Sequence, residues 1–242
     1  MPDIIRWEGS LNARFALPGL IRSANLSFLS RQGRAALLRA GISRILDLRN
    51  RSERQIDPAP FASRPEYLNL PLLPYRDRAM NAASATARSN ADVYRTYLDH
   101  AGNQIASIFG AMHDAPPGLL LVHCHAGKDR TGLVAALAQE WCGLPREQIM
   151  AEYAETDEHL GQFYAEMLEC QPDPEKRAGL ARFLVSRPED ILAALEHLDT
   201  EWNNAPAYLK ASGFGRAEQA RLVARLVARL VARLMHAGPA TS

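Results

Sequence analysis

The residues with the clearest chemical potential lie in one short stretch, "LVHCHAGKDRTGLVAAL", at positions 121–137. Arg130 follows Cys124 by six positions, with Gly127 and Lys128 between them. A loop between a strand and a helix can aim successive backbone N–H groups at one point, and the helix N-terminus adds positive potential. An arginine guanidinium matches two phosphate oxygens, and a lysine adds another cation. The stretch therefore predicts a phosphate cradle with a cysteine at its base.

A cysteine in such a cradle is a nucleophile only as a thiolate. A free thiol is only about 3% ionised at pH 7, and near-complete ionisation requires roughly 5 kcal/mol of stabilisation. A helix terminus typically supplies at most about 2 kcal/mol, so the loop amides, Arg130 and the Thr131 hydroxyl must supply the rest. The groups that bind phosphate would thus also ionise Cys124. This indicates phosphoryl transfer to sulfur and hydrolysis of the phosphocysteine, with no metal and no cofactor.

Two other functions remain open for the same stretch. One is a catalytically inactive phosphate-binding module, which the intact Cys124, Arg130 and Thr131 argue against. The other is a sulfurtransferase of the rhodanese type, which also uses a loop cysteine but does not need the "KDRTG" sequence that follows here.

The composition excludes several classes of protein. The 242 residues are 47% hydrophobic and 23% charged, which is typical of an ordinary globular chain. The net charge of +1 gives no bulk argument for nucleic-acid binding, and we expect none. Neither a secretory signal peptide nor an apolar run long enough to span a membrane is evident. We therefore expect a cytoplasmic protein, with non-classical secretion left open.

The cysteines point to a reducing compartment. Cys124, Cys142 and Cys170 are sparse and none forms a CxxC pair, so neither a disulfide scaffold nor a zinc site is expected. We expect Cys142 and Cys170 to be buried thiols. A redox partnership with Cys124 is an alternative.

The elements that must position the cradle can be predicted from capping signals and apolar patterns. We expect a helix within 30–41 that Ser30 caps, strands at 42–49, at 119–124 and, shorter and at an edge, within 66–72, a loop over 73–90, and helices over 91–115 and 131–143. The alternation of strands and helices favours an α/β fold with a central, mostly parallel sheet flanked by helices.

The second half of the chain shows only helical patterns. We expect one domain over 1–242, in which residues 146–202 form a helical insertion or lid. The "LVAR" repeat within 213–235 predicts a C-terminal amphipathic helix that packs its Leu/Val face on the domain. Because basic amphipathic helices also bind membrane surfaces, peripheral membrane contact remains an alternative.

The stretch "HCHAGKDRTG" resembles the HCxxGxxRTG signature of the cysteine-dependent protein tyrosine and dual-specificity phosphatases. Its inner "GKDR" is similar to the lipid-active branch and, more closely, to a bacterial group. The segments "IRSANLSFLSRQGRAALLRAGISRILDLRNRSER", "LPLLPYRD" and "YLKASGF" also resemble that bacterial group. The resemblance implies the fold of protein tyrosine phosphatases, a lid after residue 146, and a dual-specificity protein tyrosine phosphatase. Phosphorylated proteins would be the substrates. Phosphoinositides or inositol phosphates are an alternative that Lys128 and the basic C-terminal helix motivate.

The resemblance also implies roles for individual residues. Cys124 would be the nucleophile. Phosphate would be bound by the loop residues His125, Ala126, Gly127, Lys128, Asp129 and Arg130. The general acid is left open between Asp77, which matches an aspartate on a loop before the catalytic helix, and Asp129, because the family's "WPD" tripeptide is absent.

Four further residues are expected to support the cradle. His123 would orient the loop by hydrogen bonds, and Thr131 would donate to the thiolate. Asp47 and Arg49 lie where a predicted strand ends, and ligand sites in α/β sheets favour the carboxyl ends of strands.

Overall fold

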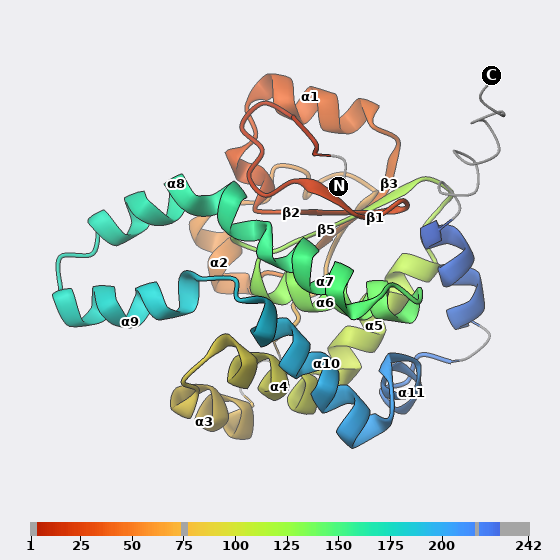
Figure 1. The fold of residues 1–242 in the computed structure, drawn as a ribbon. Helices are drawn as coiled ribbons and strands as arrows, with labels where there is room; N and C mark the ends of the chain where they lie inside the picture. Colours follow the sequence, from red (N-terminus) through yellow and green to blue (C-terminus); the bar gives the residue numbers. More distant parts are fainter. Residues whose placement is uncertain (1–3, 74–76, 216–217, 228–242) are drawn as a thin grey trace, which may run out of the picture.

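A five-stranded sheet lies at the centre of the computed structural model, which describes residues 4–73, 77–215 and 218–227 (Figure 1). The strands are β1 (Arg14–Leu17), β2 (Leu20–Ser23), β3 (Ile42–Asp47), β4 (Tyr67–Asn69) and β5 (Leu119–His123). They are ordered β1-β2-β5-β3-β4, and only the β1–β2 pair is antiparallel. The predicted α/β fold with a mostly parallel sheet is confirmed.

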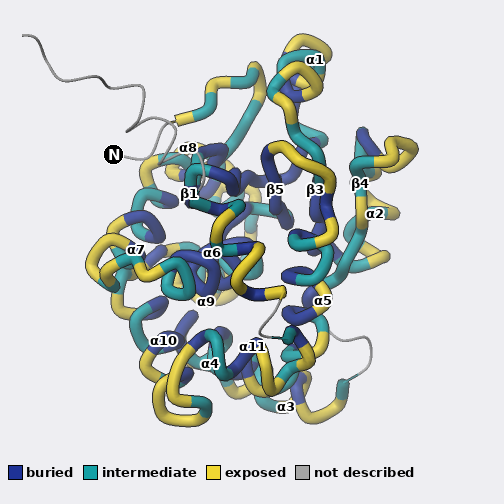
Figure 2. Tube along the Cα trace, turned by 90° about the vertical axis from the view of Figure 1, so that its right-hand side faces the viewer, coloured by how far each residue is buried: buried dark blue, intermediate teal, exposed yellow. Residues whose placement is uncertain are grey.

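Strand β5 is the central strand and is buried on both faces (Figure 2). Leu120 and Val122 belong to the larger of two hydrophobic cores, whereas Leu119 and Leu121 belong to the smaller one. A strand covered on both faces needs apolar side chains at every position, which explains the continuous run in the sequence.

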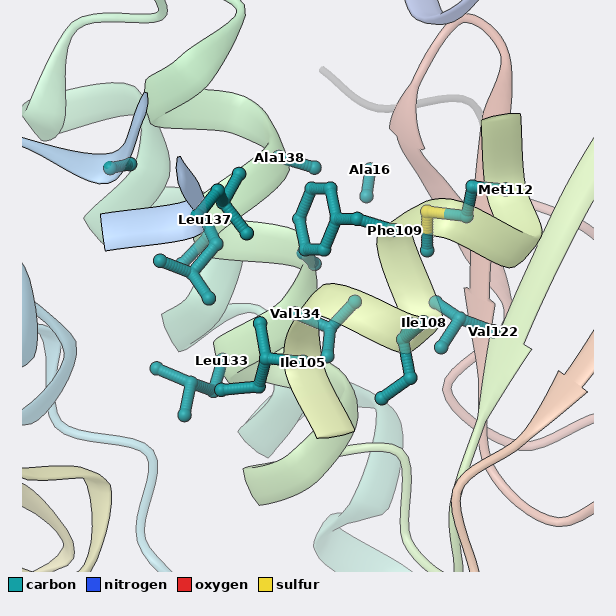
Figure 3. Packing of buried hydrophobic residues seen from close by; sticks show 14 of the residues in the cluster. Ala16, Ile105, Ile108, Phe109, Met112, Val122, Leu133, Val134, Leu137 and Ala138 are labelled. Atoms are coloured by element: carbon teal, nitrogen blue, oxygen red, sulfur yellow. The ribbon is translucent and has the colours of Figure 1, made fainter. Parts of the chain in front are cut away.

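Helices cover the two faces unequally. The smaller core lies under α1 (Arg31–Arg39) and the short 3-10 helix η1 (Leu26–Phe28). The larger core is formed with α4 (Asn90–His100), α5 (Gly102–His113), α6 (Asp129–Trp141), α7 (Arg146–Ala154), α10 (Pro188–Trp202) and α11 (Ala205–Ala211). Figure 3 shows Phe109 of α5 among the apolar side chains of α6. Because α6 is buried from Thr131 to Gln139, it provides a fixed platform behind the cradle.

The region 146–202 divides into two parts. Helices α7 and α10 pack into the larger core, for example through Ile149 and Leu195, which are fully buried. In contrast, α8 (Thr156–Glu169) and α9 (Pro174–Leu184) project from the body of the molecule as a helical hairpin, which we call the arm (Figure 1). Helix α9 has no buried residue.

Several local predictions were wrong or incomplete. The predicted loop over 73–90 contains α3 (Arg78–Thr86), an alanine-rich helix that forms through propensity and capping without a regular apolar stripe. The predicted helix over 91–115 is two helices, α4 and α5, that meet at Ala101. Strands β1 and β2, helix α2 (Arg51–Ile56) and helix α11 were not predicted.

Two features near the chain's second half also differ from expectation. Cys142 and Cys170 were both expected to be buried, but Cys142 is only partly buried and Cys170 is exposed. Cys170 is exposed because it caps α8 on the projecting arm. Residues 218–227 are helical, with Leu222 and Leu226 buried, whereas 216–217 and 228–235 of the predicted amphipathic helix lie outside the described residues. In the described part of the chain, no helix is both long and apolar enough to cross a membrane.

Candidate active site

The site lies at the carboxyl edge of the sheet, where three parallel strands end together. Ser23 of β2 and Asp47 of β3 both align with His123 of β5. Residues 124–128 then form a loop, which we call the signature loop, and α6 begins at Asp129. Helix α6 therefore starts two residues earlier than predicted.

The geometry of the signature loop suits an anion. The backbone N–H groups of residues 125–131 donate to no acceptor within the described residues. Gly127 has a φ of 68°, and a Cβ there would lie 2.4 Å from the carbonyl oxygen of Ser23, so only glycine fits. Unpaired amides at a helix N-terminus form a positively polarised site for an anion.

Cys124 lies at the base of this loop, with 3% of its surface exposed. The nearby Thr131 is in the first turn of α6. Its hydroxyl oxygen is buried and has no hydrogen-bond partner among the described residues. The hydroxyl is thus available to an anionic group in the loop.

Arg130 is held by a carboxylate that the sequence did not point out. Both terminal nitrogens of its guanidinium donate to Glu53 of α2, each over 2.7 Å. Glu53 also accepts from the backbone N–H of Asn50. Burial alone would raise the pKa of Glu53, but the bonds and charge of Arg130 hold it below its usual value. The only sequence signal for Glu53 was "NRSE", a capping pattern for a helix start.

The amine of Lys128 is turned toward the arm. Lys128 is 1% exposed, and its Nζ donates to the backbone carbonyl of Phe183, near the end of α9. The same Nζ lies 3.3 Å from Oδ1 of Asp129. The signature loop and the arm are therefore in direct contact.

The two candidate acids occupy different settings. Asp129 is at the signature loop with its side chain 37% exposed, and Tyr94 donates a 2.7 Å hydrogen bond to its Oδ1. Asp77 caps α3, where its Oδ1 accepts from the N–H of Met80 over 2.8 Å. No hydrogen bond or ion pair in the described part of the chain joins Asp77 to the signature loop.

Asp47 and Arg49 form a fully buried ion pair beside the loop. Nη2 of Arg49 lies 2.8 Å from Oδ2 of Asp47, which also accepts from the hydroxyl of Tyr67. Burial would raise the pKa of Asp47, but His123 and Arg49 hold it below its usual value. Because these groups already satisfy one another, the pair braces the strand ends and has little capacity left for a ligand.

His123 and His125 flank the nucleophile. The Nδ1 of His123 lies 3.3 Å from the carbonyl oxygen of Cys124, and burial lowers the pKa of His123. Burial also lowers the pKa of His125. The ring of His125 packs beside Phe28 of η1 and Phe163 of α8, at centroid separations of 6.2 and 6.1 Å. Phe163 thus brings the arm over the rim of the loop.

Comparison with known proteins gives consistent matches. The model of a family described as "Tyrosine phosphatase family" matches residues 17–228. The triple specificity protein phosphatase PtpB of Mycobacterium tuberculosis is 29% identical, over 85% of this chain and 90% of that protein. A tyrosine-protein phosphatase of Nostoc commune is 28% identical, over 84% of this chain and 72% of that protein.

Proposed function

This chain belongs to the tyrosine phosphatase family, and we propose on that premise that it is a dual-specificity protein tyrosine phosphatase that acts through a phosphocysteine. The observation that carries the proposal is the position of Cys124 at the base of a loop whose amides have no acceptor in the described part of the chain, six residues before Arg130, which Glu53 holds. Phosphorylated proteins are the substrate class that this proposal names.

The reaction would proceed in two displacements at phosphorus. The thiolate of Cys124 attacks the phosphorus, the bond to the leaving oxygen breaks, and an acid donates a proton to that oxygen. Water then attacks the phosphocysteine, the P–S bond breaks, and inorganic phosphate and the thiolate are released. In both steps the loop amides and Arg130 would bind the equatorial oxygens, where charge is held in the transition state.

For the proton donor we favour Asp129 over Asp77. Asp129 lies at the signature loop and is half-exposed, so its carboxyl group can reach a leaving oxygen above the phosphorus. The hydroxyl of Tyr94, which also bonds to that of Tyr153, restricts its orientation. The carboxylate of Asp77 is engaged as a helix cap.

Two contacts support a role of the arm as a lid. Phe163 packs on His125, and the carbonyl of Phe183 accepts from Lys128. Because Lys128 is a buried cation in the signature loop itself, phosphoinositides or inositol phosphates are a second candidate class of substrate. Their additional phosphates offer Lys128 an anionic partner in place of the carbonyl.

The test is a substrate panel on the full chain and on Cys124→Ser. We expect turnover of a small aryl phosphate and of phosphotyrosine and phosphoserine peptides, and a loss of roughly ten-thousand-fold or more in kcat for the variant. Cys142→Ser serves as a matched control and should retain activity. Equal, poor turnover by the wild type and Cys124→Ser would instead indicate a phosphate-binding module. Turnover of phosphoinositides above that of the peptides would favour the second substrate class.

A further inference from the structure

The carbonyl groups of the signature loop are held from behind by donors outside the loop. The carbonyl of His125 accepts from the backbone N–H of Asn25 over 2.8 Å. The side-chain amide of Asn12 donates to the carbonyls of Ala126 and Gly127 over 3.1 and 3.0 Å. Nη2 of Arg22 also donates to Gly127, over 2.6 Å.

These bonds determine where the loop amides point. In a planar trans peptide, the C=O of one residue and the N–H of the next point in opposite directions. Fixing the carbonyls of 125–127 away from the centre of the loop therefore turns the N–H groups of 126–128 toward it. A donor behind the loop acts on phosphate without touching it.

Asn12 is suited to this task by its backbone and by its orientation. It is buried and has a φ of 55°, a left-handed conformation that asparagine adopts more readily than most residues. Nη1 of Arg14 donates to its Oδ1, so its NH₂ group must face the loop. The side-chain amide is thus held in the one orientation that presents donors to both carbonyls.

Arg22 reaches the loop from β2 and is fully buried. Its Nη1 donates to Oε2 of Glu152 over 2.8 Å, while its Nη2 contacts Gly127. Glu152 belongs to α7, which packs on α6 and the larger core. The guanidinium therefore ties the loop carbonyl to a fixed helix.

We propose that Asn12 and Arg22 are positioning residues that turn the amides of the signature loop toward the phosphoryl group. The inference rests on the phosphatase function proposed above. It adds that phosphate binding requires Asn12 and Arg22 to hold the loop carbonyls. Neither residue lies in the segment that carries the nucleophile, and neither touches the substrate.

The decisive variant is Asn12→Asp. Aspartate has the same size, tolerates left-handed backbone and still accepts from Arg14, but it donates nothing and places a negative charge beside two carbonyls. Asn203→Asp is a matched control, because Asn203 is the other non-glycine residue with positive φ in the described part of the chain, at the end of α10. It has no contact with the loop among the described residues.

The readout is competitive inhibition by inorganic phosphate, measured beside kcat, KM and urea unfolding. We expect Asn12→Asp to raise the inhibition constant and lower kcat/KM by roughly 10- to 100-fold, while Asn203→Asp changes neither. A fall in unfolding stability without a change in the phosphate inhibition constant would show a merely structural role and overturn the proposal.

Arg22→Lys covers the case in which Asn12→Asp does not fold. Lysine keeps the positive charge beside Glu152 but cannot span both acceptors, so we expect a change in phosphate inhibition in the same direction and smaller. Wild-type phosphate affinity in the folded variant would overturn the inference. Turnover by the wild type tests the phosphatase function separately, since it does not depend on Asn12 or Arg22 being the groups that position the loop.

Discussion

The signature loop and the arm meet over the same site but are built in opposite ways. In the loop, Cys124, Gly127 and Lys128 are buried, and the carbonyls of 125–127 each have a partner behind them. In the arm, α9 has no buried residue, and α8 buries only Thr156, Leu160 and Tyr164. The signature loop is thus fixed by its surroundings, whereas the arm contacts the loop through only a few residues.

This difference in burial indicates different roles for the loop and the arm. Electrostatic stabilisation of a transition state requires donors that do not reorganise, and the loop is fixed by hydrogen bonds from Asn12, Arg22 and Asn25. Covering and selecting a substrate requires a part that opens at low cost, and segments with few buried contacts open most easily. We therefore expect substitutions in the loop to change the chemical step and substitutions in the arm to change substrate binding.

The largest effect that tests this division concerns the proton donor. We expect Asp129→Asn to lower kcat by roughly 100- to 1,000-fold for esters with poor leaving groups, since general acid catalysis contributes on this scale. Esters whose leaving groups need no proton should be affected far less. The measurement is kcat across a series of aryl phosphates of graded leaving-group acidity.

Asp77→Asn provides the matched comparison. Asp77 caps α3, and asparagine accepts a hydrogen bond at an N-cap as well as aspartate does. Asp77→Asn should therefore leave both the stability and the leaving-group dependence nearly unchanged. If the leaving-group effect instead followed Asp77, a residue outside the signature loop would carry out part of the chemical step. The assignment of the chemical step to the loop would then be wrong.

The sequence predicted the parts of the site that depend on neighbours along the chain. The strand, loop and helix around Cys124 and Arg130 are consecutive in the chain, from Leu119 to Trp141, and Ser30 caps α1 as expected. Each rests on local signals, such as an apolar run, a glycine and a capping residue. These signals were sufficient for the α/β fold and for the order of its central elements.

What the sequence did not reveal depends on distant contacts. Glu53 is 77 residues from its partner Arg130, Arg22 is 105 residues from Gly127, and Asn12 is 115 residues from it. No periodic pattern marks such residues, since their types are common on any surface. Helix α3 was missed for another reason, because an alanine-rich helix at the edge of the fold needs no regular apolar stripe.

A smaller effect is expected at the contact between arm and loop. Phe163→Ala removes the ring that packs on His125 and Phe28. We expect KM for a phosphotyrosine peptide to rise about 2- to 10-fold, the range of a lost aromatic pair, with kcat for a small aryl phosphate unchanged. Steady-state kinetics with both substrates measures the separation.

Phe183→Ala is the matched control on α9. It keeps the backbone carbonyl that Lys128 contacts, and its ring belongs to no aromatic pair in the described part of the chain. It should leave KM for the peptide near the wild-type value. A fall in kcat for the small substrate in Phe163→Ala would mean that the arm helps to set the geometry of the loop, and the loop and the arm could no longer be assigned separate tasks.

The smallest expected effect compares one histidine from each of the two regions. Burial lowers the pKa of His123 beside the loop and of His159 in the arm below the ordinary value of 6.5. Between the lowered pKa and 6.5 the unfolded chain binds more protons than the folded chain, so each histidine makes stability fall as the pH decreases below about 6.5. Because His123 is completely enclosed and His159 only partly, the loss through His123 should be the larger one.

Urea unfolding at pH 7.5 and 5.5 measures this difference for the wild type, His123→Asn and His159→Asn. The quantity compared is the loss of unfolding free energy between the two pH values. We expect His123→Asn to flatten the pH dependence clearly and His159→Asn to leave it almost unchanged. Because only the difference between two pH values is compared, a general loss of stability in either variant does not affect the conclusion. Equal flattening by both substitutions would mean that the arm is coupled to folding as tightly as the loop, which would contradict a lid that opens at low cost.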